Sequence, residues 1–314
     1  MNRSLCRIFV PLLALALFFA TSSPLMAGAS VEKTLHILCT TFPLYQLTRN
    51  LSQGREAVQV DLLLPAQLGC PHDYALTPKD MQLLSRAEVL VVNGLGLEEF
   101  LGAPIKKANP VLVIIDSSEG VVDLIHDQAG EGQGPDGHAP TGVNPHLFAS
   151  PRLTAQLATH IASKLALIDP DASEIYRRNG QNYAAKMMKL DREVVATANR
   201  LANKQIICQH GVFDYLARDM GLEVVAVVEA HAGQEPSAAE MLALIKTAKL
   251  KRVGGIFSEP QYPAKVLDTI AKEAGINVAT LDPVATGPED AGLDYYEQVM
   301  IKNMQTLQVS LGVK

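Results

Sequence analysis

Four side chains of types that metal ions favour stand beside proline residues or at the ends of apolar runs. They are His72, His146, His210 and Asp282. Three imidazoles and one carboxylate can form a closed tetrahedral zinc set, with Zn–N distances of ~2.0–2.1 Å. The four residues are 74, 64 and 72 positions apart along the chain, so no local motif joins them. From the residues alone, a metal site and four unrelated loop or capping residues are both open interpretations.

The elements that must position these residues alternate between short apolar runs and helical patterns. Strands are expected at 35–40, 58–64, 89–93 and 111–115, and again at 205–208, 223–228, 254–257 and 277–281. Helices are expected between them, at 43–52, 78–86 and 97–107, then at 212–220, 238–248 and 264–274. Continuous apolar strands that alternate with helices are typical of parallel sheets covered on both faces.

This pattern occurs twice. The run Ile-Leu-Cys at 37–39 matches Ile-Ile-Cys at 206–208, an offset of 169 residues. Between the two halves, a helical pattern runs from 171 to about 202 without a proline, which predicts a helix of roughly 45 Å. The predicted fold class is α/β, with two similar lobes, each a parallel sheet flanked by helices, joined by one long connector helix.

Residues 1–29 have the features of a signal peptide. Arg3 and Arg7 precede a run of about 13 apolar residues, which is shorter than the ~20 that a membrane-spanning helix needs. Small residues at 27–29 predict cleavage after Ala27 or Ala29. We therefore expect a periplasmic protein that does not span the membrane once the signal is removed.

The rest of the chain is expected to divide into three parts. These are an N-terminal α/β lobe over 30–150, a helical connector over 151–204 and a C-terminal α/β lobe over 205–314. Within the first lobe, residues 126–142 are rich in Gly, Pro and Asp and show no periodicity, which predicts a mobile surface loop.

Composition narrows the classes of function. The formal net charge is −6 and the chain has no Trp. An acidic chain is not expected to bind nucleic acid, and the lack of Trp disfavours large stacked ligands. Three cysteines follow the signal peptide: Cys39, Cys70 and Cys208. They could form one disulfide and leave one free thiol, or all three could be buried free thiols, and the sequence does not distinguish these alternatives.

The strand pattern predicts where the four candidate ligands meet. In open parallel sheets, ligands bind beyond the carboxyl ends of the strands. His72 follows the second expected strand, His210 ends the first strand of the second lobe, and Asp282 ends its last strand. His146 stands just before the connector. All four are therefore expected between the lobes.

Several short motifs, in the same order along the chain, resemble those of the periplasmic metal-binding proteins of ABC importers for zinc and manganese. The stretches are 40–45, 71–74 with Thr77-Pro78, 93–98, 144–148, His210 with 213–215, 235–237, 256–259 and 281–283. The resemblance implies two α/β lobes joined by a long helix, and His72, His146, His210 and Asp282 as the metal ligands. It also implies a monomer that delivers its metal to an ABC transporter membrane permease.

The resemblance and the ligand chemistry together favour zinc over manganese. In the family, manganese receptors tend to have Glu at the position of His210, and imidazole suits zinc. The transported ligand is therefore expected to be Zn²⁺, with Mn²⁺ as the alternative. This chain departs from the family pattern in having Asn144 before Pro-His, where Asp is usual, and Phe148, where Trp is usual.

Three further residues are candidates for accessory roles. Glu259 is expected to orient a ligand histidine through its second ring nitrogen, with a plain surface carboxylate as the alternative. His126 and His138 are what remains here of the long His-rich loop found in many zinc receptors. They are either a weak accessory site or part of a solvated loop.

The predicted function is therefore binding and delivery of zinc without catalysis. One alternative is a secreted zinc-dependent hydrolase, which would need an open coordination position and a general base. Another is a siderophore- or corrinoid-binding receptor with the same architecture, and a surface adhesin is also compatible with the fold.

Overall fold

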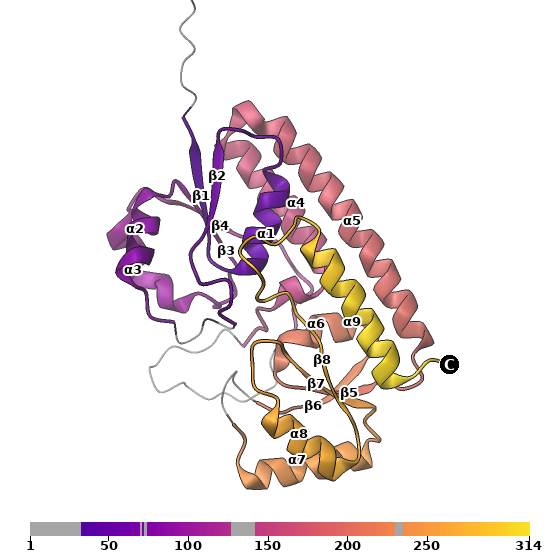
Figure 1. Cartoon of the computed structure of the whole chain (residues 1–314). Helices are drawn as coiled ribbons and strands as arrows, with labels where there is room; N and C mark the ends of the chain where they lie inside the picture. Colours follow the sequence, from indigo (N-terminus) through magenta and orange to yellow (C-terminus); the bar gives the residue numbers. More distant parts are fainter. Residues whose placement is uncertain (1–32, 70, 72–73, 127–141, 230–234) are drawn as a thin grey trace, which may run out of the picture. The chain divides into compact units, whose positions relative to one another are not determined.

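The computed structural model describes residues 33–69, 71, 74–126, 142–229 and 235–314. Within these residues the chain forms two parallel four-stranded sheets (Figure 1). The first has the order β2-β1-β3-β4, with β1 Leu35–Cys39, β2 Val58–Leu62, β3 Val89–Val92 and β4 Val113–Asp116. The second has the order β6-β5-β7-β8, with β5 Gln205–Cys208, β6 Glu223–Val227, β7 Gly255–Ser258 and β8 Val278–Thr280. The expected α/β fold with two similar lobes is confirmed.

Helices cover both faces of each sheet. The first lobe has α1 Phe42–Leu51, α2 Pro78–Arg86 and α3 Gly102–Ala108, and the second has α6 Asp214–Met220, α7 Ala238–Leu250 and α8 Lys265–Ala274. The described residues also form four short 3₁₀ turns: η1 Glu99–Leu101, η2 Leu147–Ala149, η3 Pro170–Ala172 and η4 Gly211–Phe213. The single helix expected at 97–107 is therefore divided into η1 and α3, and the one expected at 212–220 begins as η4.

The central strands of the two sheets place their side chains in the same way. In β1, Ile37 and Cys39 join the core shared with the long helices, and Leu38 faces the other side, toward α2 and α3. In β5, Ile206 and Cys208 belong to the same shared core, and Ile207 faces α7 and α8. This alternation follows from the two-residue period of a strand. It explains why the sequence repeats at this offset.

Three longer helices complete the described elements. They are α4 Pro151–Ile168, α5 Ser173–Arg200 and α9 Tyr295–Leu311. The 28 residues of α5 span roughly 42 Å, and α5 packs on α1 of the first lobe and on α6 of the second. Pro151 and the Ser150 hydroxyl, which accepts from the backbone N–H of Leu153, begin α4. The expected long connector helix is therefore confirmed as α5, and α4 precedes it in the connector.

The C-terminal part of the chain returns to the first lobe before it forms α9. The carbonyl of Gly287 accepts from Gln67, that of Ala291 from Arg49, and that of Leu293 from Asn50. From there α9 runs beside α5 to the second lobe (Figure 1). The chain thus crosses between the lobes in this region as well as through α5.

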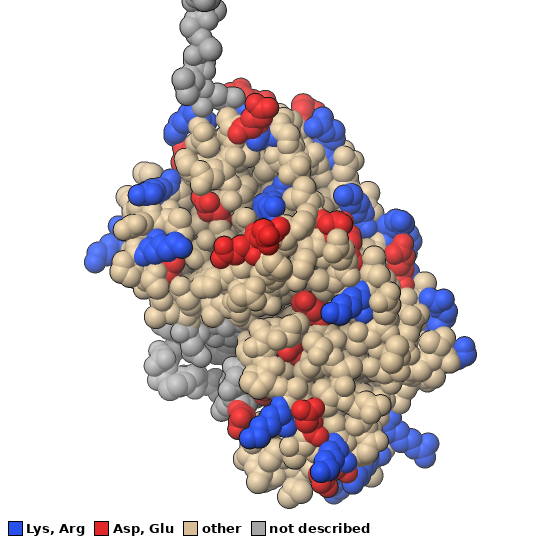
Figure 2. All heavy atoms as spheres, in the orientation of Figure 1, with Lys and Arg blue, Asp and Glu red and all other residues tan. Residues whose placement is uncertain are grey.

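Charged side chains are mixed on the face of the molecule shown in Figure 2. Lys and Arg lie interspersed with Asp and Glu, and most of this face consists of other residues. No helix in the described parts of the chain combines the length and the apolarity needed to cross a bilayer.

Candidate metal centre

His146 and His210 lie face to edge between the lobes. Their ring centroids are 5.3 Å apart and their planes make an angle of 81°. Each residue is only 6% exposed. His146 stands at the start of η2, after β4 and before α4, and His210 links β5 to η4. Two of the predicted ligands, 64 positions apart in sequence, are therefore brought together.

Glu259, at the end of β7, contacts Nδ1 of His210. Its carboxylate is held from the other side by Gln261, whose side-chain amide donates to Oε2 at 2.7 Å. The backbone N–H of Glu259 donates to the side chain of Gln209. A carboxylate at Nδ1 keeps the proton on that nitrogen and leaves the lone pair of Nε2 for a metal. Nε2 of His210 is buried and has no hydrogen-bond partner among the described residues.

His146 is oriented through the same ring nitrogen. Its Nδ1 lies 2.8 Å from Oδ1 of Asn144, and the same oxygen accepts from the backbone N–H of His146 at 3.0 Å. An amide oxygen can only accept, so Nδ1 carries the proton and Nε2 is the nitrogen with the lone pair. Both histidines are therefore set to coordinate through Nε2.

Asp282 follows β8 and is held by α9. Its backbone N–H and carbonyl make two hydrogen bonds with the side-chain amide of Asn303, at 2.9 and 2.7 Å. Its carboxylate accepts from the backbone N–H of Val284, a residue with a φ of 65°. Burial raises the pKa of Asp282.

The described residues do not form a complete set of ligands. Among them, no group of three or more His, Cys, Asp or Glu side chains lies close enough to hold a metal ion. His72 lies outside the described residues, as do Cys70, His138 and the rest of 127–141. The assignment of His72, His146, His210 and Asp282 as metal ligands thus stays a prediction.

The two histidines line a cavity with about 310 Å³ of empty space, part of which is open to solvent. From the first lobe and the chain that leads to α4 it is lined by Thr41, Pro43, Gly69, Pro71, Leu97, His146 and Phe148. From the second it is lined by His210, Val212, Glu259, Gln261 and Ala285. Pro71, the residue before His72, thus lies at the same cavity. Glu259 is the only charged carboxylate among these lining residues, and both of its oxygens are engaged.

The other singled-out residues lie elsewhere. His126 is exposed, and its backbone forms an isolated antiparallel bridge with Val143. The bridge therefore joins the chain before 127–141 to the chain after it. Cys39 and Cys208 are buried free thiols, and burial raises the pKa of the Cys39 thiol to about 12. Neither thiol lines the cavity.

Three supporting side chains were not identified from the sequence. Gln209 and Gln261 hold Glu259, and Tyr215 donates to the carbonyl of Asn144. Gln209 is adjacent to a predicted ligand, and Gln261 is two residues from Glu259. Their proximity to these residues was the only available signal.

Comparison with known proteins is consistent with this geometry. The family described as "ZnuA: Zinc-uptake complex component A periplasmic" matches residues 37–310. The chain is 32% identical over 290 residues to the high-affinity zinc uptake system protein ZnuA of Bacillus subtilis (strain 168), covering 89% of this chain and 88% of that one.

Solved structures show the same fold. A crystal structure of ZnuA matches with a TM-score of 0.75 and 30% identity, over 89% of this chain and all of that one. The protein FpvC from Pseudomonas aeruginosa, solved in complex with Mn²⁺, matches with a TM-score of 0.76 and 30% identity, over 89% of this chain and 98% of that one. The resemblance inferred from the motifs is confirmed, and the chain belongs to the ZnuA family of periplasmic zinc-uptake components.

Proposed function

We propose that this protein captures Zn²⁺ in the cavity between its lobes and delivers it to an ABC transporter permease. The observation that carries the proposal is the pair of buried histidines, each with Nδ1 engaged by an acceptor, at the carboxyl ends of the strands. Buried imidazoles held in this way are typical of metal ligands. We propose His72 and Asp282 as the remaining ligands. We also propose that the protein is a monomer, and that it is exported with its signal peptide cleaved after Ala27 or Ala29.

Zinc is proposed as the main cargo, with Mn²⁺ as the alternative. Imidazole nitrogens suit zinc, and carboxylates suit manganese. Glu259 is turned toward Nδ1 of His210, so of the two nearby carboxylates only Asp282 is proposed as a ligand. The Mn²⁺ complex of FpvC, which has the same fold, is the reason to test both metals.

The contacts of Glu259 argue against a hydrolase. Such an enzyme needs a base close to a metal-bound water, whereas both oxygens of Glu259 are engaged by His210 and Gln261. A siderophore or corrinoid receptor is not favoured either, because the described lining residues include neither Lys nor Arg. The proposed role is therefore binding without catalysis.

Metal analysis of the protein purified from the periplasm, followed by a competition titration of Zn²⁺ against Mn²⁺, tests this proposal. We expect one zinc per chain and tighter binding of Zn²⁺. Tighter binding of Mn²⁺ would reassign the cargo, and binding of neither metal would reject the proposed function.

A further inference from the structure

Asn144 connects the two histidine-bearing segments through a single side-chain amide. Its Oδ1 accepts from the backbone N–H and lies next to Nδ1 of His146. Its Nδ2 donates to the carbonyl of Gly211 at 2.7 Å and to Oδ2 of Asp214 at 3.0 Å. Gly211 follows His210 directly in the chain, and Asp214 begins α6. One amide thus relates the ring of His146 to the backbone beside His210.

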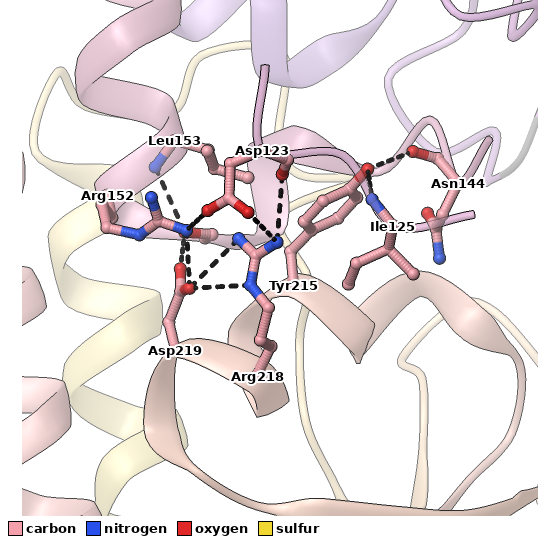
Figure 3. Close-up of polar contacts among 9 residues, drawn as sticks. Asp123, Ile125, Asn144, Arg152, Leu153, Tyr215, Arg218 and Asp219 are labelled. Atoms are coloured by element: carbon pink, nitrogen blue, oxygen red, sulfur yellow. Dashed lines mark hydrogen bonds and ion pairs between the residues drawn. The ribbon is translucent and has the colours of Figure 1, made fainter. Parts of the chain in front are cut away.

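The backbone of Asn144 is held by the same helix. The Tyr215 hydroxyl donates to its carbonyl at 2.7 Å and accepts from the backbone N–H of Ile125 at 3.0 Å (Figure 3). The N–H of Asn144 in turn donates to the carbonyl of Ile125. Asn144 is only 2% exposed, so water cannot easily replace these contacts. Its position is therefore set by the second lobe as well as by its own segment.

The pattern of contacts requires an amide. One end of the side chain faces two N–H donors of His146, and the other end faces two acceptors, Gly211 and Asp214. A carboxylate would serve the first end but would set an oxygen against both acceptors. A buried acceptor that faces acceptors is strongly unfavourable. Asn is thus the residue that satisfies both ends.

We propose that Asn144 is a positioning residue that couples the two histidines across the lobe boundary. It sets the Nδ1–H tautomer and the orientation of His146 relative to the backbone beside His210, and thereby the separation of the two metal-binding nitrogens. This inference rests on the proposed function, because it concerns how the proposed ligands are held. It does not depend on which metal is bound.

The first test is a cycle of variants measured by zinc competition titration. Asn144→Asp keeps the oxygen that accepts from His146 but replaces the NH₂ group that donates to Gly211 and Asp214 with an oxygen. We therefore expect zinc affinity to fall by roughly 10–100-fold. Adding Asp214→Asn should recover part of that loss, because the amide at position 214 can then donate to the carboxylate. Asp214→Asn alone should change affinity less than Asn144→Asp.

Asn179→Asp is the matched control. Asn179 also donates to two backbone carbonyls, those of Leu51 and Gln53, at a place remote from the cavity. The variant Asn179→Asp should lower the unfolding temperature without changing zinc affinity. Equal zinc affinity in the wild type and Asn144→Asp, or no recovery in the double variant, would overturn the proposal.

Nitrogen NMR of the metal-free wild-type protein supplies a test that needs no variant to fold. It should show His146 with its proton on Nδ1, and a proton on Nε2 would overturn the proposal. Thermal unfolding of the same cycle gives the coupling between Asn144 and Asp214 without metal. If the wild type binds no zinc but this coupling is present, the proposed function fails and the link across the lobes stands.

Discussion

The carboxylate of Glu259 contacts Nδ1 of His210, and Nε2 of the same ring is buried with no hydrogen-bond partner among the described residues. The contact with Glu259 determines that Nδ1 carries the proton. Nε2 therefore has a lone pair, which is directed away from Glu259. A buried polar atom without a partner is unfavourable unless something binds it. The pair therefore has the form expected of a ligand and the carboxylate that orients it.

Removing Glu259 should weaken zinc binding even though it is not proposed as a ligand. We expect Glu259→Ala to lower affinity by roughly 10–100-fold, because the ring of His210 loses its orientation and its basicity. Glu259→Gln should lose less, since an amide oxygen still accepts from Nδ1–H. Titration calorimetry checks both variants against Glu119→Ala, which removes an exposed carboxylate paired with Lys164. Unchanged affinity in Glu259→Ala would contradict the orienting role.

Replacing His210 should weaken zinc binding more than replacing His126. His210 lines the cavity, whereas His126 is exposed and is not among the described lining residues. We expect His210→Ala to exceed the ~10–100-fold loss typical of contacts behind a ligand, and His126→Ala to leave affinity near that of the wild type. His138→Ala is expected to behave like His126→Ala. Equal losses in all three variants, measured by calorimetry, would reject the ligand assignment.

Asp219 should stabilise the fold much more than its neighbour Asp123. The side chain of Asp219 is 6% exposed and accepts from Arg152, Arg218 and Ser150, which joins α4 to α6 (Figure 3). Asp219→Ala should lower the free energy of unfolding by about 2 kcal/mol, because hydrogen bonds to charged groups are lost.

Asp123 bonds to the same two arginines but is 54% exposed. Asp123→Ala should therefore cost at most ~1 kcal/mol. Denaturant unfolding of both variants compares these values directly. Equal costs would show that burial of Asp219 does not determine the strength of the cluster.

Zinc binding should cause little closure of the lobes. Hinges need loop or terminal residues that absorb changes in the backbone, whereas α5 is a continuous helix that packs on both lobes, and one core extends from the first sheet to the second. Small-angle scattering should give nearly the same radius of gyration with and without zinc. A large compaction on addition of zinc would show that the segments between the lobes bend.

Glu98 should make stability depend on pH. Desolvation raises its pKa from 4.5 to about 7, although its carboxylate accepts from the Thr40 hydroxyl and the N–H groups of Asn93 and Gly94. Between these two pH values the folded state keeps a proton that the unfolded state has lost. Stability therefore falls as pH rises from 4.5 to 7, by at most roughly 3 kcal/mol.

Glu98→Gln removes this titration. The difference in unfolding free energy between the wild type and the variant should decrease over this pH range and become flat above it. A constant difference over this pH range would show that burial does not raise the pKa of Glu98.

Elements with a strong hydrophobic pattern could be predicted from the sequence. The central strands β1 and β5 were predicted almost to the residue, because side chains on both faces of a buried parallel strand are apolar. The helical pattern that runs from 171 to about 202 without a proline predicted α5. The helix α9 was missed, although Tyr296, Val299, Asn303, Leu307 and Leu311 have helical spacing.

The sequence also determined which side chains are candidates for metal chemistry, since their types and their places after strands can be read along the chain. It could not show that Asn144 bonds to Gly211 and Asp214, or that Glu259 contacts His210, because each contact joins residues 49 to 70 positions apart. Such contacts depend on how the two lobes pack on the long helices. The ring nitrogen that His210 presents to the cavity depends on the acceptor that folding brings beside the other nitrogen, so it can be assigned only from the fold.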